Sequence, residues 1–401
     1  MDQATGQRLA NKGSESRSTL TANGRVGLSR RRWFVPGPQG GSVTPLDALV
    51  DRMEATISLG TRCLACRVNG DAKSFEKAAA TLQETAQLTL SGESLRQVVE
   101  NEGKKVLQLA QAGVLVPGWK AVDCKVLTPE GAEVSRVYLG SDAFTMPAVT
   151  EAEKQTRRKK IKAQRQKRGR KARPLPRAKK GADQKYKEAK VVTFYDQTMK
   201  HRLVSVTRGN ADAAGCLMRR DAEQLEFHRA QERVGNIDGG PWIIRQIEKR
   251  LAMTATGLDF YHLGENVHKS RRIVSGEEAP AGQQWAGEML HAAKHEGYEA
   301  LWEGLMEWRK KTRGGKRREA DRLIAYVSDR RAMIRYPEFK KRGWQIGSGP
   351  TESECRLLPD RIKGPGKRWD PDNAEAVMAL EAVDQSHQWS AYWKLAYLHP
   401  N

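Results

Sequence analysis

The amino-acid sequence predicts an α/β fold, in which a mixed sheet with helices on both faces is joined to a helical N-terminal domain and a helical insertion. Five segments have the alternating or β-branched composition of strands: 134–147, 190–196, 201–207, 234–238 and 255–262. Amphipathic patterns at 211–231 and 242–252 place helices between the later strands, as connections between parallel strands require. A long helical pattern, rich in charge and tryptophan, occupies 277–335.

The region before the first of these strands contains a hairpin and helices. Residues 1–20 are polar and are predicted to form a disordered tail, and 21–42 a β-hairpin around an Asn-Gly pair, with a glycine-rich loop at 37–41. A helical N-terminal domain is expected over 43–130, in three helices: 46–64, 73–88 and 92–112. The third helix fits a helix-turn-helix that binds DNA or docks a partner, but a plain helical bundle explains the pattern equally well.

The later domain boundaries follow from the same patterns. Tryptophans 285, 302 and 308 are expected to pack inside the insertion, and those at 389 and 393 to anchor the C-terminal tail. The predicted segments are a core of 131–276 and 343–372, a basic arm at 154–185 within that core, the helical insertion at 277–342, and a C-terminal helix and tail at 373–401.

The charge predicts a nucleic-acid partner. The chain has 70 Lys and Arg against 48 Asp and Glu, a formal charge of +22. The densest basic run follows the first predicted strand, and a second basic loop lies near 364–369. Alone, such a run would be a solvated helix or a flexible arm, whereas against DNA it neutralises phosphates. The predicted DNA-binding residues are Arg157, Arg158, Lys159, Lys160, Lys162, Arg165, Lys167, Arg168, Arg170, Lys171, Lys363, Lys367 and Arg368.

Several classes of protein and cofactor are not expected. The five cysteines do not form a disulfide framework, which favours a reduced, cytoplasmic protein. Cys63 and Cys66 form a lone pair without further ligands at zinc-finger spacing, so no zinc is expected. No run of 18 apolar residues predicts a membrane span, no apolar leader begins the chain, and no Walker loop predicts a nucleotide.

Three carboxylates are the candidate catalytic residues. Asp142 lies in the first strand, Asp238 follows the fourth strand at a glycine turn, and Glu352 lies on a helix after the glycine loop 343–350. When the first and fourth strands are neighbours, the two aspartates lie side by side, and a helix packed on the sheet adds the glutamate. Three carboxylates suit two Mg²⁺ ions about 3.5–4 Å apart, which activate a nucleophile and stabilise the leaving oxygen. Aspartates at strand ends also occur in ordinary turns.

These segments resemble a known family. The stretches 137–142 (Val-Tyr-Leu-Gly-Ser-Asp), 235–242 (Gly-Asn-Ile-Asp-Gly-Gly-Pro-Trp), 258–262 (Leu-Asp-Phe-Tyr-His) and 346–353 (Ile-Gly-Ser-Gly-Pro-Thr-Glu-Ser) are similar to bacterial insertion-sequence DDE transposases. Their layout resembles the Mutator-like superfamily, with a ribonuclease H-like core, over roughly residues 20–395.

The resemblance implies a function and a set of residues. It implies a transposase that cleaves transposon-end DNA and transfers strands to target DNA, with two Mg²⁺ or Mn²⁺ ions held by Asp142, Asp238 and Glu352. Asp259 and His262 match an Asp-x-x-His signature on the fifth strand with a supporting role; in an alternative assignment Asp259 is the second metal ligand. It further implies a homodimer or larger assembly on double-stranded DNA in the bacterial nucleoid.

The chain also departs from the family pattern. Ala143 stands where the family often has glycine, and no cysteine-rich segment precedes the hairpin. Glu354, two positions after Glu352, faces another side of the helix and is not the expected ligand. Two other functions stay open at this point: a ribonuclease H-like nuclease or resolvase, and a transposase derivative that binds DNA without catalysis.

Overall fold

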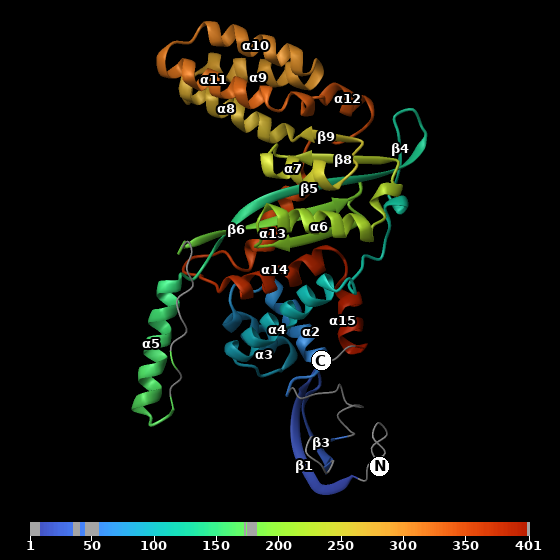
Figure 1. The fold of residues 1–401 in the computed structure, drawn as a ribbon, viewed down its shortest axis with the longest axis vertical. Coiled ribbons are helices and arrows are strands. Elements are labelled where there is room, and N and C mark those ends of the chain that lie inside the picture. Colours follow the sequence, from blue (N-terminus) through green and yellow to red (C-terminus); the bar gives the residue numbers. More distant parts are fainter. Residues whose placement is uncertain (1–8, 35–40, 45–55, 172–173, 175–182, 399–401) are drawn as a thin grey trace. The chain divides into compact units, whose positions relative to one another are not determined.

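The computed structural model describes residues 9–34, 41–44, 56–171, 174 and 183–398, and the chain divides into two compact units (Figure 1). The first unit comprises Met1–Val116 and Asp360–Asn401, and the second comprises Pro117–Pro359. The C-terminal helices therefore pack with the N-terminal ones. The sequence had assigned 343–372 wholly to the core and 373–401 to a separate tail.

The first unit begins with a β-hairpin. Strand β1 (Ala10–Thr21) pairs antiparallel with β2 (Gly24–Phe34), which also pairs with the short β3 (Ser42–Val43). The turn lies at the predicted Asn-Gly, where Gly24 has φ +100°. The prediction of a disordered tail is wrong for β1. Most of its side chains are polar and exposed, and backbone pairing with β2 orders it, with Leu20 near its end as the buried apolar residue.

The described residues of the first unit also form the helices α2 (Leu59–Asp71), α3 (Phe75–Ala86), α4 (Gly92–Gln111), α14 (Pro371–Gln385) and α15 (Trp389–Leu398). Serine side chains cap α2, α3 and α4 by accepting a hydrogen bond from a first-turn N–H. The α4 and α14 backbones approach closely, because a Cβ on Gly103 would lie 2.1 Å from the carbonyl oxygen of Ala376. Much of the helix predicted at 46–64 and of the loop at 37–41 lies outside the described residues.

The second unit is built on a mixed six-stranded sheet, which confirms the predicted α/β class. Its strands run in the order β7-β6-β5-β8-β9, and β4 pairs with β5. The β5–β6 and β6–β7 pairs are antiparallel, whereas β5–β8 and β8–β9 are parallel. The strands are β4 (Lys125–Leu127), β5 (Glu133–Pro147), β6 (Tyr186–Tyr195), β7 (Arg202–Thr207), β8 (Glu232–Ile237) and β9 (Ala255–Leu258).

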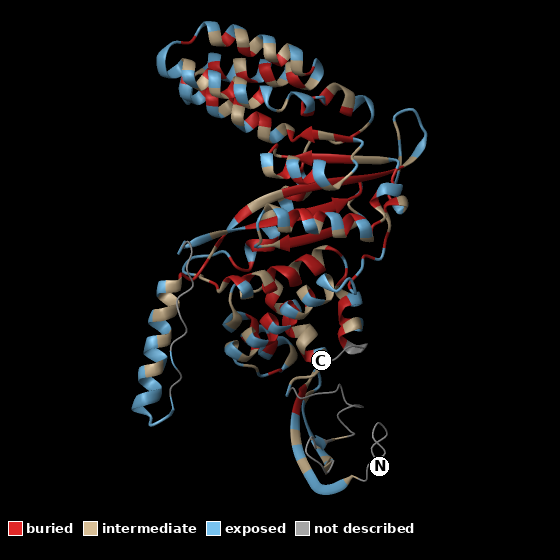
Figure 2. Cartoon of the chain, in the orientation of Figure 1, coloured by how far each residue is buried: buried red, intermediate tan, exposed pale blue. Residues whose placement is uncertain are grey.

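Helices cover both faces of this sheet, as predicted. Val137 and Leu139 of β5 belong to the core cluster that includes Met218 of α6 (Ala211–Gln224) and Ile243 of α7 (Pro241–Arg250). The alternate residues of β5 point to the other face, where Tyr138 packs with residues at and after α12 (Tyr336–Lys341). Buried residues are concentrated along the sheet strands (Figure 2).

Four helices follow β9: α8 (Phe260–Ser275), α9 (Pro280–His295), α10 (Tyr298–Lys310) and α11 (Gly314–Ser328). The last three lie within the predicted helical insertion at 277–342, and α8 precedes it. Trp308 is buried and stacks on the half-buried Trp285 with ring centroids 4.1 Å apart, as the predicted packing of these tryptophans requires. Trp302 is half-buried and stacks on Tyr298. No helix in the described part of the chain is long and apolar enough to cross a bilayer.

Two elements of the second unit end earlier than predicted. The helix predicted at 211–231 ends at Gln224, and a short 3₁₀ turn, Phe227–Arg229, follows it. The strand predicted at 255–262 ends at Leu258, and α8 begins at Phe260. Asp259 caps that helix through its side chain, which accepts a hydrogen bond from the backbone N–H of His262. The capping bond ends the strand earlier than the apolar pattern suggested.

Candidate carboxylate and metal site

Asp142 and Asp238 lie on neighbouring strands. Strands β5 and β8 are parallel, and Leu139 pairs with Gly235 at the end of their ladder. Asp142 and Asp238 stand equally far beyond that pair, so the two carboxylates are level across the sheet. Asp142 is still within β5, where it pairs with Val191 of β6, while Asp238 follows the last residue of β8. The predicted adjacency of the first and fourth core strands is confirmed.

The turn after β8 fixes the Asp238 side chain. Its Oδ1 accepts a hydrogen bond of 2.7 Å from the backbone N–H of Gly240. Gly239 has φ +75°, and Arg330 donates to its carbonyl oxygen at 2.8 Å. Pro241 then occupies the first turn of α7, as predicted. The turn that carries Asp238 is thus held from the end of α11 as well as from its own backbone.

Helix α13 (Gly349–Asp360) brings Glu352 to the same face of the sheet. Gly140 of β5 makes room for it, because a Cβ there would lie 1.8 Å from Oγ1 of Thr351. Thr351 Oγ1 also lies 2.7 Å from Oγ1 of Thr193 on β6. One turn later, Cys355 donates its thiol hydrogen to Oδ2 of Asp142, with Sγ and Oδ2 3.3 Å apart. The helix therefore runs past Gly140 toward Asp142, on the face of the sheet to which the Asp142 side chain points.

Asp259 and His262 join this cluster from the start of α8. Asp259 is fully buried, and its two carboxylate oxygens accept from backbone N–H groups, Oδ1 from His262 at 2.9 Å and Oδ2 from Ser348. Asp259 thereby ties α8 to the glycine loop before α13. The Nε2 atom of His262 lies 3.8 Å from Oε1 of Glu352. His262 sits in a helix turn rather than on the fifth strand, where the sequence had placed it.

The charges in this cluster act on one another. Burial raises the pKa of Asp238, and the nearby Asp142 carboxylate raises it further. The Gly240 N–H, His262 and Arg330 lower this pKa but do not cancel the rise. Burial also raises the pKa of Glu352, with Asp259 contributing in the same direction. Burial opposes protonation of His262, but the carboxylates of Asp259, Glu265 and Asp238 outweigh it and raise its pKa. Carboxylates that lie close together in a partly buried site repel one another, and a bound divalent cation would reduce that repulsion.

The cluster offers carboxylate oxygens and one imidazole nitrogen as ligand atoms for a divalent cation. Among the described residues, Asp259, His262 and Glu352 offer ligand atoms that all lie within 4.8 Å of one another. Asp142, Asp238 and Glu352 do not form such a compact group there. A pair of ions separated by about 3.5–4 Å needs ligands spread more widely than a single ion does. Each carboxylate oxygen of Asp259 accepts one backbone hydrogen bond and keeps a second lone pair, so the alternative in which Asp259 is the second metal ligand stays open.

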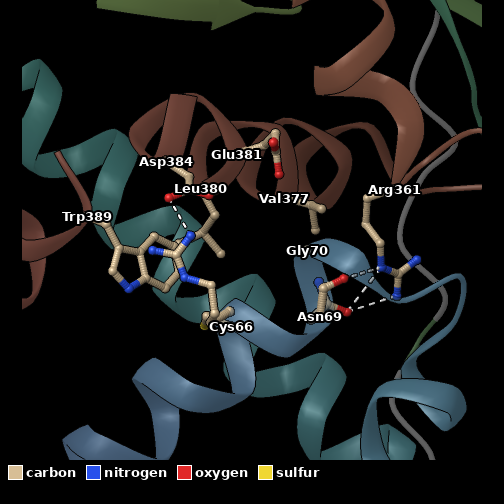
Figure 3. A pocket seen from close by; sticks show the side chains of 10 residues that line it. Cys66, Asn69, Gly70, Arg361, Val377, Leu380, Glu381, Asp384 and Trp389 are labelled. Atoms are coloured by element: carbon tan, nitrogen blue, oxygen red, sulfur yellow. Dashed lines mark hydrogen bonds and ion pairs between the residues drawn. The ribbon is translucent and has the colours of Figure 1, made fainter. Parts of the chain in front are cut away.

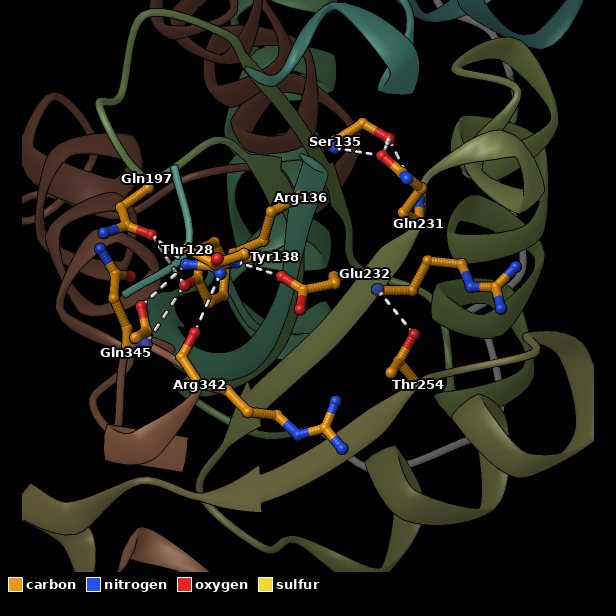
Figure 4. Close-up of polar contacts among 12 residues, drawn as sticks. Thr128, Ser135, Arg136, Tyr138, Gln197, Gln231, Glu232, Thr254, Arg342 and Gln345 are labelled. Carbon is orange, nitrogen blue, oxygen red and sulfur yellow. Dashed lines mark hydrogen bonds and ion pairs between the residues drawn. The ribbon is translucent and has the colours of Figure 1, made fainter. Parts of the chain in front are cut away.

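A buried arginine that the sequence did not single out connects the three segments bearing the carboxylates. Arg136 of β5 is 1% exposed, and its guanidinium pairs with Glu232 of β8 at 2.6 Å (Figure 4). It also donates to the carbonyl oxygens of Arg342 and Gly343, which begin the loop leading to Glu352. Tyr138 strengthens this junction by accepting from the backbone N–H of Gln345 at 3.1 Å. The sequence feature that could have indicated this role is a single arginine within an otherwise largely apolar strand pattern.

The predicted basic arm forms helix α5 (Glu151–Lys167), which has no buried residue (Figure 2). Thr150 and Glu153 form a capping box at its start. Arg158 is half-buried and pairs with Glu151 at 3.4 Å, and Lys162 is also half-buried. The other predicted contacts from Arg157 to Lys171 are exposed. The helix and residues 168–171 thus present a dense positive surface to solvent, while most of the rest of the predicted arm, 172–173 and 175–182, lies outside the described residues.

The second basic loop belongs to the first unit, because the unit boundary falls at Asp360. Lys363 is exposed, whereas Lys367 and Arg368 are half-buried. Lys367 donates to the carbonyl oxygen of Arg361 at 3.1 Å, and burial together with the Arg361 charge lowers its pKa. Lys367 is therefore engaged within the loop, and Lys363 is the more accessible of the predicted contacts here.

A pocket in the first unit does not compete as the active site. It lies between α2, α14 and Arg361, and Figure 3 shows Arg361 donating to Asn69 across it. Its cavity of about 20 Å³ is close to the space that one water molecule needs. Arg361 also stacks on the ring of Phe75, 4.4 Å from its centroid. These contacts indicate a packed helix junction.

No protein-family model matches the chain, and no curated protein sequence matches it. The chemistry available to the carboxylate cluster therefore follows from its own geometry and charge.

Proposed function

We propose that the chain is a DDE transposase, which cleaves transposon-end DNA and joins the freed 3′-hydroxyl to target DNA. The observation that carries the proposal is the convergence of three segments far apart in sequence. Asp142 in β5 and Asp238 just after the parallel neighbour β8 stand at the same level, and the helix bearing Glu352 contacts Asp142 through Cys355. The same unit also carries the exposed basic helix α5.

The proposal includes a ribonuclease H-like core. Numbering the core strands along the chain from β5, the sheet order is third, second, first, fourth, fifth. The first three strands are antiparallel, and the last two run parallel to the first. This order makes the first strand central and places the fourth beside it, which is what a site built from Asp142 and Asp238 needs.

In this proposal Asp142, Asp238 and Glu352 hold two Mg²⁺ or Mn²⁺ ions. When bound, such ions lower the pKa of a nucleophilic water or hydroxyl and stabilise charge on phosphate oxygens. The Asp259 carboxylate keeps the start of α8 and the loop before α13 together through its two backbone hydrogen bonds. His262 lies against Glu352 and orients it, and Arg330 holds the turn that carries Asp238. These three are positioning residues.

The exposed basic residues of α5 and 168–171 supply contacts to DNA phosphates. Such contacts fix the position of the duplex without reading its sequence. Two transposon ends are processed together, so we propose that the chain acts on DNA as a homodimer or larger assembly.

The decisive experiment follows cleavage and strand transfer with a labelled duplex carrying the ends of the element that encodes the chain. Wild-type protein is compared with Asp142→Asn and Glu352→Gln in Mg²⁺ or Mn²⁺. Each substitution removes a ligand charge, so we expect cleavage to fall by about a hundredfold or more. Glu303→Gln is the matched control, because Glu303 is an exposed carboxylate on α10. It should cleave as wild type does.

The same assay separates the alternatives. Hydrolysis without joining of a supplied 3′-hydroxyl end would identify a nuclease or resolvase. DNA binding without metal-dependent cleavage in the wild type would identify a derivative without catalysis. Equal cleavage by wild type and Asp142→Asn would remove Asp142 from the mechanism and overturn the proposal.

A further inference from the structure

A second group of metal-ligand side chains lies in the same unit and takes no part in the proposed transposition chemistry. Cys124 stands between the 3₁₀ turn Ala121–Asp123 and β4, while Asp196 and His201 lie in the turn between β6 and β7. One ligand atom from each, the Cys124 thiol, an Asp196 carboxylate oxygen and a His201 ring nitrogen, all lie within 4.8 Å of one another.

The turn holds the Asp196 carboxylate in a fixed orientation. Its Oδ1 accepts from the backbone N–H of Thr198 at 3.1 Å, and Thr198 Oγ1 donates to both carboxylate oxygens. Nδ1 of His201 lies 2.9 Å from Oδ2 of Asp196, and the His201 ring packs against Trp119 at 5.4 Å. Ligand side chains in metal sites are commonly fixed in this way by a surrounding layer of hydrogen bonds.

We propose that Cys124, Asp196 and His201 bind one transition-metal ion of the zinc class. A thiolate, an imidazole and a carboxylate form a ligand set that suits Zn²⁺ and leaves a fourth tetrahedral position for water. Mg²⁺ prefers oxygen ligands throughout, so this group and the carboxylate cluster select different ions. The expectation of no zinc was based on Cys63 and Cys66, which lie on helix α2.

The burial of Cys124 favours a metal ligand over a catalytic nucleophile. Cys, His and Asp side chains also form nucleophile sites, but the Cys124 residue is only 1% exposed and a substrate could not reach its sulfur. The His201 side chain is 20% exposed and gives an ion and its water access to the group. On binding, the thiol proton passes to solvent as the metal–sulfur bond forms. The ion would join the turn before β4 to the β6–β7 turn.

The test uses Co²⁺ as a probe on the full-length protein freed of metal by chelation. A cysteine ligand gives Co²⁺ an intense thiolate-to-metal absorption that an oxygen-ligand site cannot give. We expect wild type to bind one equivalent with this absorption and Zn²⁺ to displace it. Cys124→Ser and His201→Ala should lose the absorption or weaken Co²⁺ affinity by at least about tenfold. Cys216→Ser, which removes an exposed thiol on α6, is the matched control and should bind as wild type does.

Cys355 provides the discriminating variant, because its thiol lies at the carboxylate cluster. Absorption that is lost in Cys355→Ser but kept in Cys124→Ser would assign the ion to that cluster and overturn the proposal. The absence of any thiolate absorption in wild type would overturn it too. Far-ultraviolet circular dichroism of each metal-free variant shows whether it is folded, and His201→Ala, in a partly exposed turn, keeps the test valid if Cys124→Ser does not fold. Neither outcome depends on transposase activity.

Discussion

Arg136 and Glu232 are paired residues on the parallel strands β5 and β8, and their side chains form an ion pair of 2.6 Å. They stand the same number of residues before Asp142 and Asp238 on those strands. Because the guanidinium of Arg136 also holds two carbonyl oxygens of the loop leading to α13, one side chain connects the three segments that carry the candidate metal ligands.

Removing this guanidinium is expected to destabilise the second unit. Arg136→Met leaves the mostly buried Glu232 charge and two carbonyl oxygens without their donor, which should cost about 3–5 kcal/mol in the free energy of unfolding. Urea denaturation measures the loss. Arg331→Met is the matched control, because the pair of Arg331 with Glu299 has side chains 67% and 68% exposed and should contribute little. Equal losses in the two variants would contradict this assignment.

Gly140→Ala is expected to displace α13 and the glutamate it carries. The new Cβ would overlap Thr351 and approach Oγ1 of Thr193 at 2.9 Å, so the helix must shift. We expect a loss of about 1–3 kcal/mol in stability and weaker Mn²⁺ binding, measured by thermal unfolding and by calorimetry.

The control for that substitution is Gly287→Ala on helix α9, where a Cβ would meet nothing within 4 Å. Alanine is the better helix former, so this variant should be as stable as wild type or more so by up to about 1 kcal/mol. Unchanged Mn²⁺ binding in Gly140→Ala would show that α13 does not need its close approach to β5.

The raised pKa values of Asp238 and Glu352 predict how pH affects stability. Both lie above their values in the unfolded chain because of burial, so without metal these carboxyls contribute stability at low pH that is lost as the pH rises through the raised values. A divalent ion binds the ionised forms. The increase in Tm on adding Mg²⁺ should therefore grow between about pH 4 and pH 8.

Substitutions test whether these carboxylates cause the Mg²⁺-dependent increase in Tm. Asp238→Asn should reduce the Mg²⁺-dependent increase in Tm across the whole range, whereas Glu303→Gln, at an exposed position on α10, should leave it unchanged. Differential scanning fluorimetry at matched ionic strength is sufficient. An increase in Tm that does not vary with pH would argue against ion binding by these carboxylates.

Neutralising the exposed face of α5 should weaken DNA binding without regard to sequence. Glutamine at Arg157, Lys159, Lys160, Arg165 and Lys167 removes five exposed charges from the helix. If all five contact phosphates, the slope of log K against log salt should fall by about 0.9 for each. Fluorescence anisotropy over a salt series with two unrelated duplexes measures this.

A charge-matched variant in the helical insertion is the control. It carries glutamine at the exposed residues Lys310, Lys311, Arg313, Lys316 and Arg318, which changes net charge equally. If both variants lose the same affinity and slope, total charge rather than α5 governs binding.

The sequence by itself determined much of the second unit. Its β-branched runs gave the core strands, since those residues suit a buried pleated surface, and Pro241 correctly marked the start of α7. Asp142, Asp238 and Glu352 were selected by local pattern and by resemblance. Local pattern failed for β1, whose order comes from pairing with β2, and for the end of β9, which the Asp259 cap decides.

The tertiary structure alone decided which side chains meet. That Gly140 admits Thr351, that Arg136 reaches the loop before α13, and that Cys124 lies beside Asp196 and His201 depend on contacts between residues far apart along the chain. It also placed α14 against α4 in one unit, through the close approach of Gly103 to Ala376. Hydrophobic periodicity reports which face of an element is buried, but the partner of that face is set by packing across the whole fold.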